Sequence, residues 1–168
     1  MYTREQIESA VKAKGYKWFE NGDYNVNIVG IRNMETGDRV TNRFDDHLTI
    51  SYKVDGEWCY EIFNCTTDPG DDWMDKPMLE KGCAILVPGQ YRGSHKLRLH
   101  QGKYLALGQQ RPVKVYRDRD KDGMYDFDET TIDEGLFGIN IHRATKYAGK
   151  TSTYVDKWSA GCQVIASN

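Results

Sequence analysis

The sequence predicts a single mainly β domain of the β-rich α+β class, with one short helix at its N-terminus. Three observations support this: apolar and polar residues alternate in several short runs, glycine and aspartate turn signals separate the runs, and a helix-capping pattern stands at the start of the chain. The 16 glycines and 11 tyrosines fit strands and turns better than a helical bundle. Because the 168 residues contain no repeat or linker, residues 1–168 are expected to form one domain with one core.

The N-terminal segment, residues 1–20, is predicted to form a short amphipathic helix. Thr3 and Gln6 have the spacing of a capping box, in which each side chain accepts a hydrogen bond from the other residue's backbone. Apolar residues follow at helical spacing from Ile7 onward. Gly15 is the expected end of the helix.

The remaining residues, 24–168, are predicted to form a β-rich body. Residues 47–54 alternate strictly and run into Asp55-Gly56, a strong hairpin turn signal, after which residues 57–66 return as the partner strand. Further strands are expected at residues 25–31, 84–87, 104–107, 113–116 and 138–142.

Charge and hydropathy exclude several classes of function. The formal net charge is −2, so no general attraction to nucleic acid or to an acidic membrane surface is expected. No apolar run approaches the roughly 20 residues that a membrane span needs. Residues 1–20 contain no apolar core of a signal peptide, so none is visible and synthesis in the cytoplasm is expected.

The four cysteines do not form a recognisable framework. No Cys-x-x-Cys pair is present, which argues against a zinc ribbon or a thioredoxin-type site. Cys59 and Cys65 would lie about 20 Å apart in one strand, too far to form a disulfide. Free thiols are therefore expected, although a pairing of either cysteine with Cys83 stays open.

The last thirty residues contain a candidate thiol site. His142 ends an apolar strand, and a tight turn of small residues leads from Ser159 through Gly161 to Cys162. A cysteine nucleophile needs a base beside it, which an imidazole supplies, and the backbone N–H groups of Cys162 and Gly161 could face an oxyanion. A small buried cysteine and a structural histidine are the competing interpretation of the same residues.

These residues resemble a known family. Sixteen residues separate His142 from Ser159-Ala160-Gly161-Cys162, which is similar to the His–spacer–Ser/Thr-His-Gly-Cys signature of L,D-transpeptidase (YkuD-like) catalytic domains. The strand and Pro-Gly-x-Tyr turn at residues 84–91 and the apolar strand at 137–143 resemble the segments that precede this signature. The resemblance covers residues 80–168 and extends to small phage- or prophage-encoded members that act on the cell wall.

The resemblance implies a β-sandwich or barrel fold with a catalytic segment at residues 138–165. It implies that Cys162 is the nucleophile, that His142 is its base, and that Ser159 and Gly161 shape the turn and oxyanion hole. The implied reaction forms a thioester on a peptidoglycan stem peptide and needs no cofactor. Hydrolysis, as in a lysin-like endopeptidase or carboxypeptidase, and transpeptidation both remain open as the second step.

Two departures from the family pattern leave alternatives open. Ala160 replaces the usual histidine, and Val164 replaces a polar residue that commonly helps to bind substrate. Arg143 is the expected substitute for carboxylate recognition, because its guanidinium can grip a carboxylate with two hydrogen bonds. The alternatives are a catalytically weak or inactive virion or wall-binding module of the same fold, and a cysteine peptidase acting on protein substrates.

The resemblance also suggests where the protein acts and what it contacts. Peptidoglycan stem peptides are the expected partners, reached after phage release or as part of a virion with other virion proteins. Tyr91, in the turn before the site, and Trp73, expected as an exposed aromatic that stacks on sugar, are further candidate substrate contacts. His95 and His100 are expected to be surface histidines of a modest basic strand rather than metal ligands.

An acidic loop fits the calcium-binding pattern D-x-[DN]-x-[DN]-G-x5-E in full. The expected ligands are Asp118, Asp120, Asp122, the Met124 carbonyl, Asp126 and Glu129. The flanking residues suit strands rather than the two helices of an EF-hand. A structural Ca²⁺ site and a solvated Asp-rich turn both remain possible.

Overall fold

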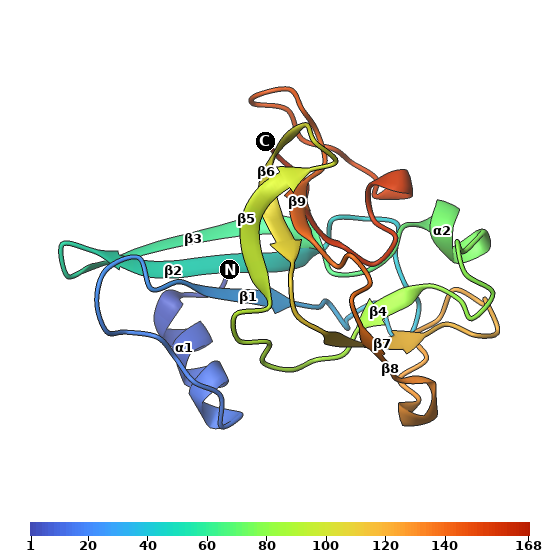
Figure 1. Cartoon of the computed structure of the whole chain (residues 1–168), viewed down its shortest axis with the longest axis horizontal. Helices are drawn as coiled ribbons and strands as arrows, with labels where there is room; N and C mark the ends of the chain where they lie inside the picture. The colour runs from blue at the N-terminus through green and yellow to red at the C-terminus, as the bar shows by residue number, and fades with distance from the viewer.

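The computed structural model describes all 168 residues and contains two sheets and two α-helices. Seven strands form a sheet in the order β1-β2-β3-β10-β9-β6-β5, and three form a small sheet in the order β4-β7-β8. The strands of the large sheet are β1 (Asn27–Ile31), β2 (Asp46–Val54), β3 (Glu57–Thr66), β5 (His95–His100), β6 (Tyr104–Gln109), β9 (Ile141–Arg143) and β10 (Gln163–Ile165). Those of the small sheet are β4 (Ala84–Leu86), β7 (Val113–Arg117) and β8 (Asp133–Gly135). The mainly β class with a short N-terminal helix is thus confirmed (Figure 1).

Helix α1 (Arg4–Ala13) begins as the capping box predicts. The Thr3 hydroxyl accepts a hydrogen bond from Gln6 N at 3.3 Å, and the Gln6 side chain accepts one from Thr3 N at 2.9 Å. The helix is shorter than the predicted segment 1–20, because Gly15 with φ +75° ends it. Its buried Ile7 anchors it beneath the sheet.

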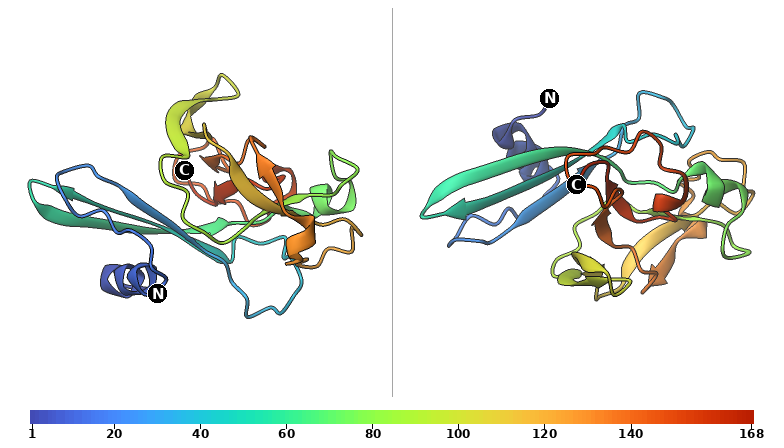
Figure 2. Two further views of the ribbon diagram at one scale, coloured as in Figure 1. Left: turned by 60° about the horizontal axis from the view of Figure 1, so that its bottom comes forward. Right: turned by 90° about the horizontal axis from the view of Figure 1, so that it is seen from above.

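The β2–β3 hairpin is the longest regular feature of the molecule. Asp55 and Gly56 both have positive φ, +51° and +81°, as a two-residue turn of type I′ requires. The pairing runs without interruption from Val54↔Glu57 to Asp46↔Cys65. The far end of the hairpin projects from the body with α1 packed below it (Figure 2).

Strands β9 and β10 form the one parallel pair of the large sheet, and they position the thiol site. β10 enters between β3 and β9, with His142 opposite Val164 in the register. The connection between the two strands is long, as a parallel pair requires. β6 joins the other side of β9 through the pair Leu107↔Ile141 and carries β5 as the sheet edge.

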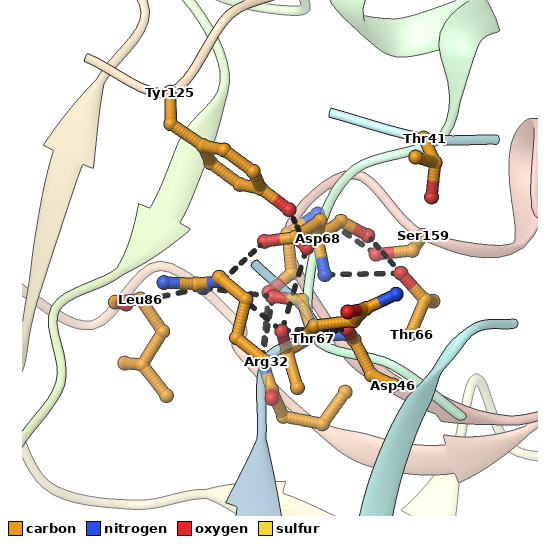
Figure 3. A network of polar contacts seen from close by, with 12 residues as sticks. Arg32, Thr41, Asp46, Thr66, Thr67, Asp68, Leu86, Tyr125 and Ser159 are labelled. Carbon is orange, nitrogen blue, oxygen red and sulfur yellow. Dashed lines mark hydrogen bonds and ion pairs between the residues drawn. The ribbon is translucent and has the colours of Figure 1, made fainter. Parts of the chain in front are cut away.

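A buried polar network joins the two sheets (Figure 3). Asp46 accepts hydrogen bonds from the Thr67 N–H and hydroxyl at 2.6 and 2.7 Å. Asp68 accepts one from Arg32 Nε at 2.9 Å and one from the Tyr125 hydroxyl at 2.7 Å. Because Tyr125 belongs to the acidic loop, this network holds that loop against the large sheet.

Several local expectations need correction. The predicted strand at 138–142 begins later, at Ile141, because Gly138 has φ +74° and turns the chain. Residues 71–75, for which no helix is predicted, form the short helix α2 (Asp71–Asp75). The sequence did not predict β8. All four cysteines are free, and neither α-helix is long and apolar enough to cross a membrane.

Candidate active site

The thiol of Cys162 lies directly before β10 and is partly exposed. Its Sγ donates a hydrogen bond to the Gly138 carbonyl at 3.3 Å. Burial raises the pKa of the Cys162 thiol, while a hydrogen bond from the Asn140 backbone N–H opposes this shift. The thiol is therefore protonated at neutral pH and needs a base before it can attack.

His142 is buried in β9 and is held by its backbone neighbour. Its Nδ1 donates to the Arg143 carbonyl at 2.9 Å, so the neutral ring carries its proton on Nδ1 and leaves the Nε2 lone pair free. Burial lowers the pKa of His142, and the nearby His100 lowers it further, while the hydrogen bond to Arg143 raises it. A neutral imidazole with a free Nε2 is the form that a general base requires.

The structure brings His142 and Cys162 to neighbouring segments, although they are twenty positions apart in the chain: His142 lies in β9, and Cys162 directly precedes β10, the strand parallel to β9. Val164 lies opposite His142 in the register, and Cys162 packs against the cluster that contains Val164. No hydrogen bond joins the Cys162 thiol to the His142 ring, since the thiol is bonded to the Gly138 carbonyl.

Ser159 and Gly161 build the turn before the nucleophile. The fully buried Ser159 hydroxyl donates to the Cys162 carbonyl at 2.8 Å and accepts from the Gly161 N–H at 3.1 Å. Gly161 has φ +123°, and a Cβ there would lie 2.5 Å from the Ala84 carbonyl oxygen. Because the Gly161 N–H already donates its hydrogen bond to the Ser159 hydroxyl, the expectation that this N–H faces an oxyanion is wrong. The Cys162 N–H has no acceptor and remains available.

The three predicted substrate contacts have different surroundings. The Arg143 guanidinium lies 4.4 Å from the Tyr104 ring centroid beside His142, and it pairs with no carboxylate. The Tyr91 hydroxyl donates to the Val87 carbonyl at 2.7 Å, so Tyr91 is part of the packing around β4 and β7.

Trp73 is half-buried rather than exposed. Its ring packs against the core cluster around Met74, and its Nε1 donates to the Lys157 carbonyl at 3.3 Å. The expectation of an exposed aromatic at Trp73 is therefore wrong. Of the three candidates, only Arg143 lies beside the imidazole.

Sequence reasoning missed two rings at the site, His100 and Tyr104. The ring of His100 stacks on that of His142, with centroids 4.3 Å apart and planes inclined by 25°. The Tyr104 hydroxyl donates to the Arg143 carbonyl at 3.2 Å and lies 3.4 Å from His142 Nδ1. The basic strand expected at His95 and His100 is β5, but the approach of the β5–β6 hairpin to His142 follows only from the tertiary fold.

The acidic loop brings together part of the predicted ligand set. Carboxylate oxygens of Asp118, Asp120 and Asp126 all lie within 4.8 Å of one another, so this triad could hold a metal ion. Asp122 instead accepts a hydrogen bond from the Met124 N–H at 2.8 Å, and the exposed Glu129 begins a 3₁₀ turn. Neither residue belongs to the triad, so the complete calcium-loop arrangement is not formed.

Asp118 is the unusual member of the triad. Its side chain is buried, with 1% of the residue exposed. One carboxylate oxygen accepts a hydrogen bond from the Lys121 N–H at 3.0 Å, and the other oxygen has no hydrogen-bond partner. Burial, followed by the charges of Asp126 and Asp120, raises the pKa of Asp118 to about 6. An unpartnered buried carboxylate oxygen is costly unless a cation or a proton satisfies it.

Comparisons with protein-family models, with curated proteins and with solved structures find no match to this chain.

Proposed function

We propose that this protein is a cysteine acyltransferase or peptidase that forms a thioester on a peptidoglycan stem peptide. The observation that carries the proposal is the position of His142 in β9 and of Cys162 directly before the parallel strand β10, with the imidazole held in the Nδ1–H form by the Arg143 carbonyl. The family resemblance of residues 80–168 supplies the substrate class.

The reaction uses the groups in turn. The thiol leaves the Gly138 carbonyl and transfers its proton to His142 Nε2, and the sulfur forms a bond to the substrate carbonyl carbon. The Cys162 N–H donates to the developing oxyanion. The C–N bond then breaks, and the amine departs with the proton from His142. Water or a second amine, deprotonated by the same imidazole, finally cleaves the thioester.

Arg143 is the proposed contact for a substrate carboxylate. Its guanidinium is fixed by the Tyr104 ring at 4.4 Å and by a hydrogen bond to the Thr145 carbonyl. It forms no ion pair within the chain and can therefore form one with a carboxylate of the peptide substrate.

A second candidate is a binding module of the same fold without efficient catalysis. The observation that favours it is that the Cys162 thiol is hydrogen-bonded to the Gly138 carbonyl rather than to the His142 ring. The two proposals differ in whether a covalent intermediate forms.

Intact-protein mass spectrometry after incubation with a disaccharide-tetrapeptide tests the enzyme proposal against the binding-module proposal. The enzyme proposal predicts an adduct of the acyl donor that maps to Cys162 and is absent in Cys162→Ala. Cys59→Ala, which removes another partly exposed thiol, is the matched control and should still form the adduct. Binding without an adduct would favour the module, and equal acylation by L-amino-acid peptides would favour a general cysteine peptidase.

We also propose that the acidic triad binds Ca²⁺ in a structural role. The proposal is supported by the unpartnered Asp118 oxygen and by the preference of Ca²⁺ for carboxylate and carbonyl oxygens. Calorimetric titration should show Ca²⁺ uptake that Asp120→Asn and Asp126→Asn weaken at least tenfold. Glu134→Gln, an exposed acid in β8, is the control. Absence of uptake at millimolar Ca²⁺ would refute the site.

A further inference from the structure

The β5–β6 hairpin places aromatic rings against the imidazole of the candidate base. His100 ends β5, and its ring stacks on His142 with a centroid separation of 4.3 Å. Tyr104 pairs with His100 in the strand register and packs against it at 5.4 Å. His142 lies 38 or more residues from both hairpin rings in the chain, so only the tertiary fold brings the hairpin to His142.

His142 needs more than its one backbone hydrogen bond to hold a fixed orientation. The bond from Nδ1 to the Arg143 carbonyl favours the Nδ1–H tautomer, but a tilt of the ring plane would weaken this bond and with it the preference for that tautomer. The face contact with His100 restricts that tilt, and the Tyr104 hydroxyl lies at the same ring edge as Nδ1. Together these contacts restrain one face and the Nδ1 edge of the His142 ring.

From this geometry we infer that His100 is a positioning residue, which fixes the plane of His142 so that its Nε2 serves the Cys162 thiol. The inference rests on the proposed function for the identity of the reaction, but not for the contact itself. His100 would act on His142 by ring packing and not by proton transfer. In stacked rings the nitrogens lie side by side, whereas a proton transfer needs them in line.

The charges around His100 favour its neutral form. Arg98 and Lys103 of the hairpin face it, and burial together with these two charges lowers the pKa of His100. The groups from the other packed elements are the Tyr104 hydroxyl of β6 and His142 and Arg143 of β9. None of these groups is an acid that would stabilise a proton on His100 at neutral pH, so the two stacked imidazoles stay neutral together.

The test compares His100→Ala, which removes the ring, with His100→Phe, which keeps a ring but cannot titrate. His47→Ala is the matched control, since the His47 ring also packs against an aromatic ring, that of Tyr2, but in β2 on a different part of the sheet. Nitrogen-15 NMR of the folded proteins measures the tautomer of His142 and its titration midpoint. The rate of acyl-enzyme formation on Cys162 is measured in parallel.

His100→Ala should give a mixture of His142 tautomers, raise the titration midpoint of His142 and slow acylation roughly tenfold. His100→Phe and His47→Ala should retain the Nδ1–H tautomer and an acylation rate within about twofold of the wild type. An unchanged tautomer, midpoint and rate in His100→Ala would overturn the inference, as would equal losses in His100→Phe and His100→Ala.

The two proposals fail in different ways. If the wild type forms no acyl-enzyme but His100→Ala still alters the His142 tautomer, the positioning role stands and the proposed function is wrong. If the wild type forms the acyl-enzyme and His100→Ala leaves the His142 spectrum unchanged, the positioning role is wrong and the proposed function stands.

Discussion

The Tyr125 hydroxyl donates a hydrogen bond of 2.7 Å to the buried Asp68 carboxylate. Tyr125 is the chain neighbour of Asp126 in the acidic triad, and Asp68 directly precedes the segment that leads into α2. Gly70 in that segment donates its N–H to the Ser159 carbonyl at 2.9 Å, at the base of the thiol turn. A continuous series of contacts therefore connects the acidic loop with the turn that carries Cys162.

Tyr125→Phe should destabilise the fold by about 1–2 kcal/mol, because Asp68 loses a hydrogen-bond donor in a buried site. Urea unfolding of the two proteins measures the difference. Tyr24→Phe changes an exposed tyrosine and should leave the free energy of unfolding within about 0.5 kcal/mol of the wild type. Equal stability of Tyr125→Phe and the wild type would show that Arg32 alone satisfies Asp68.

Gly161→Ala should be far more damaging than its small size suggests. The added Cβ would lie 2.5 Å from the Ala84 carbonyl oxygen, and the residue must keep φ +123°, so we expect a loss of about 3 kcal/mol or more. Gly149→Ala is the matched control, since Gly149 also has a positive φ, +71°, but no atom within 4 Å of the added Cβ.

Thermal unfolding compares the two glycine variants. Gly149→Ala should lower the free energy of unfolding by only about 1–2 kcal/mol, which is the effect of the left-handed backbone conformation alone. A similar loss in both variants would mean that the thiol turn can move away from β4, and the close approach to Ala84 would then have no structural role.

Local patterns explain which parts of the structure the sequence could predict. The capping box at Thr3 and the Asp55-Gly56 turn act through residues a few positions apart, so α1 and the β2–β3 hairpin were predictable. The insertion of β10 between β3 and β9 depends on pairings across the whole chain, and so does the stack of His100 on His142. Neither has a local signal.

The acidic loop shows a different kind of limit. Its spacing fits a calcium loop in full, yet only three of its carboxylates converge. The short Asp122 side chain bonds to the Met124 N–H two residues later, and Glu129 is taken up by the 3₁₀ turn that leads into β8. In an EF-hand two helices set the conformation of such a loop, whereas here β7 precedes it and a 3₁₀ turn and β8 follow it.

Alkylation of Cys162 should depend on pH as expected for a protonated thiol. Burial raises the pKa of Cys162, and burial lowers that of His142, so no thiolate–imidazolium pair is expected at neutral pH. The rate of reaction with iodoacetamide, followed by peptide mapping at Cys162, should therefore keep rising above pH 8. A plateau already reached at pH 6–7 would reveal an ion pair and contradict this prediction.

The buried carboxyl of Asp46 should make the protein less stable as the pH rises from about 4 to about 6. Burial, with the nearby Asp68 charge, raises the pKa of Asp46 to about 6, against about 3.9 for aspartate in an unfolded chain. In this interval the folded protein retains a proton that the unfolded chain has lost, so the contribution of Asp46 to stability is greatest below pH 4 and declines toward pH 6.

The difference between wild type and Asp46→Asn isolates this carboxyl from His95, His100 and His142, whose pKa values are lowered by burial and whose contribution to stability changes with pH in the opposite direction. The free energy of unfolding of the wild type minus that of Asp46→Asn should fall by about 2–3 kcal/mol between pH 4 and pH 7. If this difference does not vary with pH, the hydrogen bonds from Thr67 and Asn33 keep Asp46 ionised despite its burial.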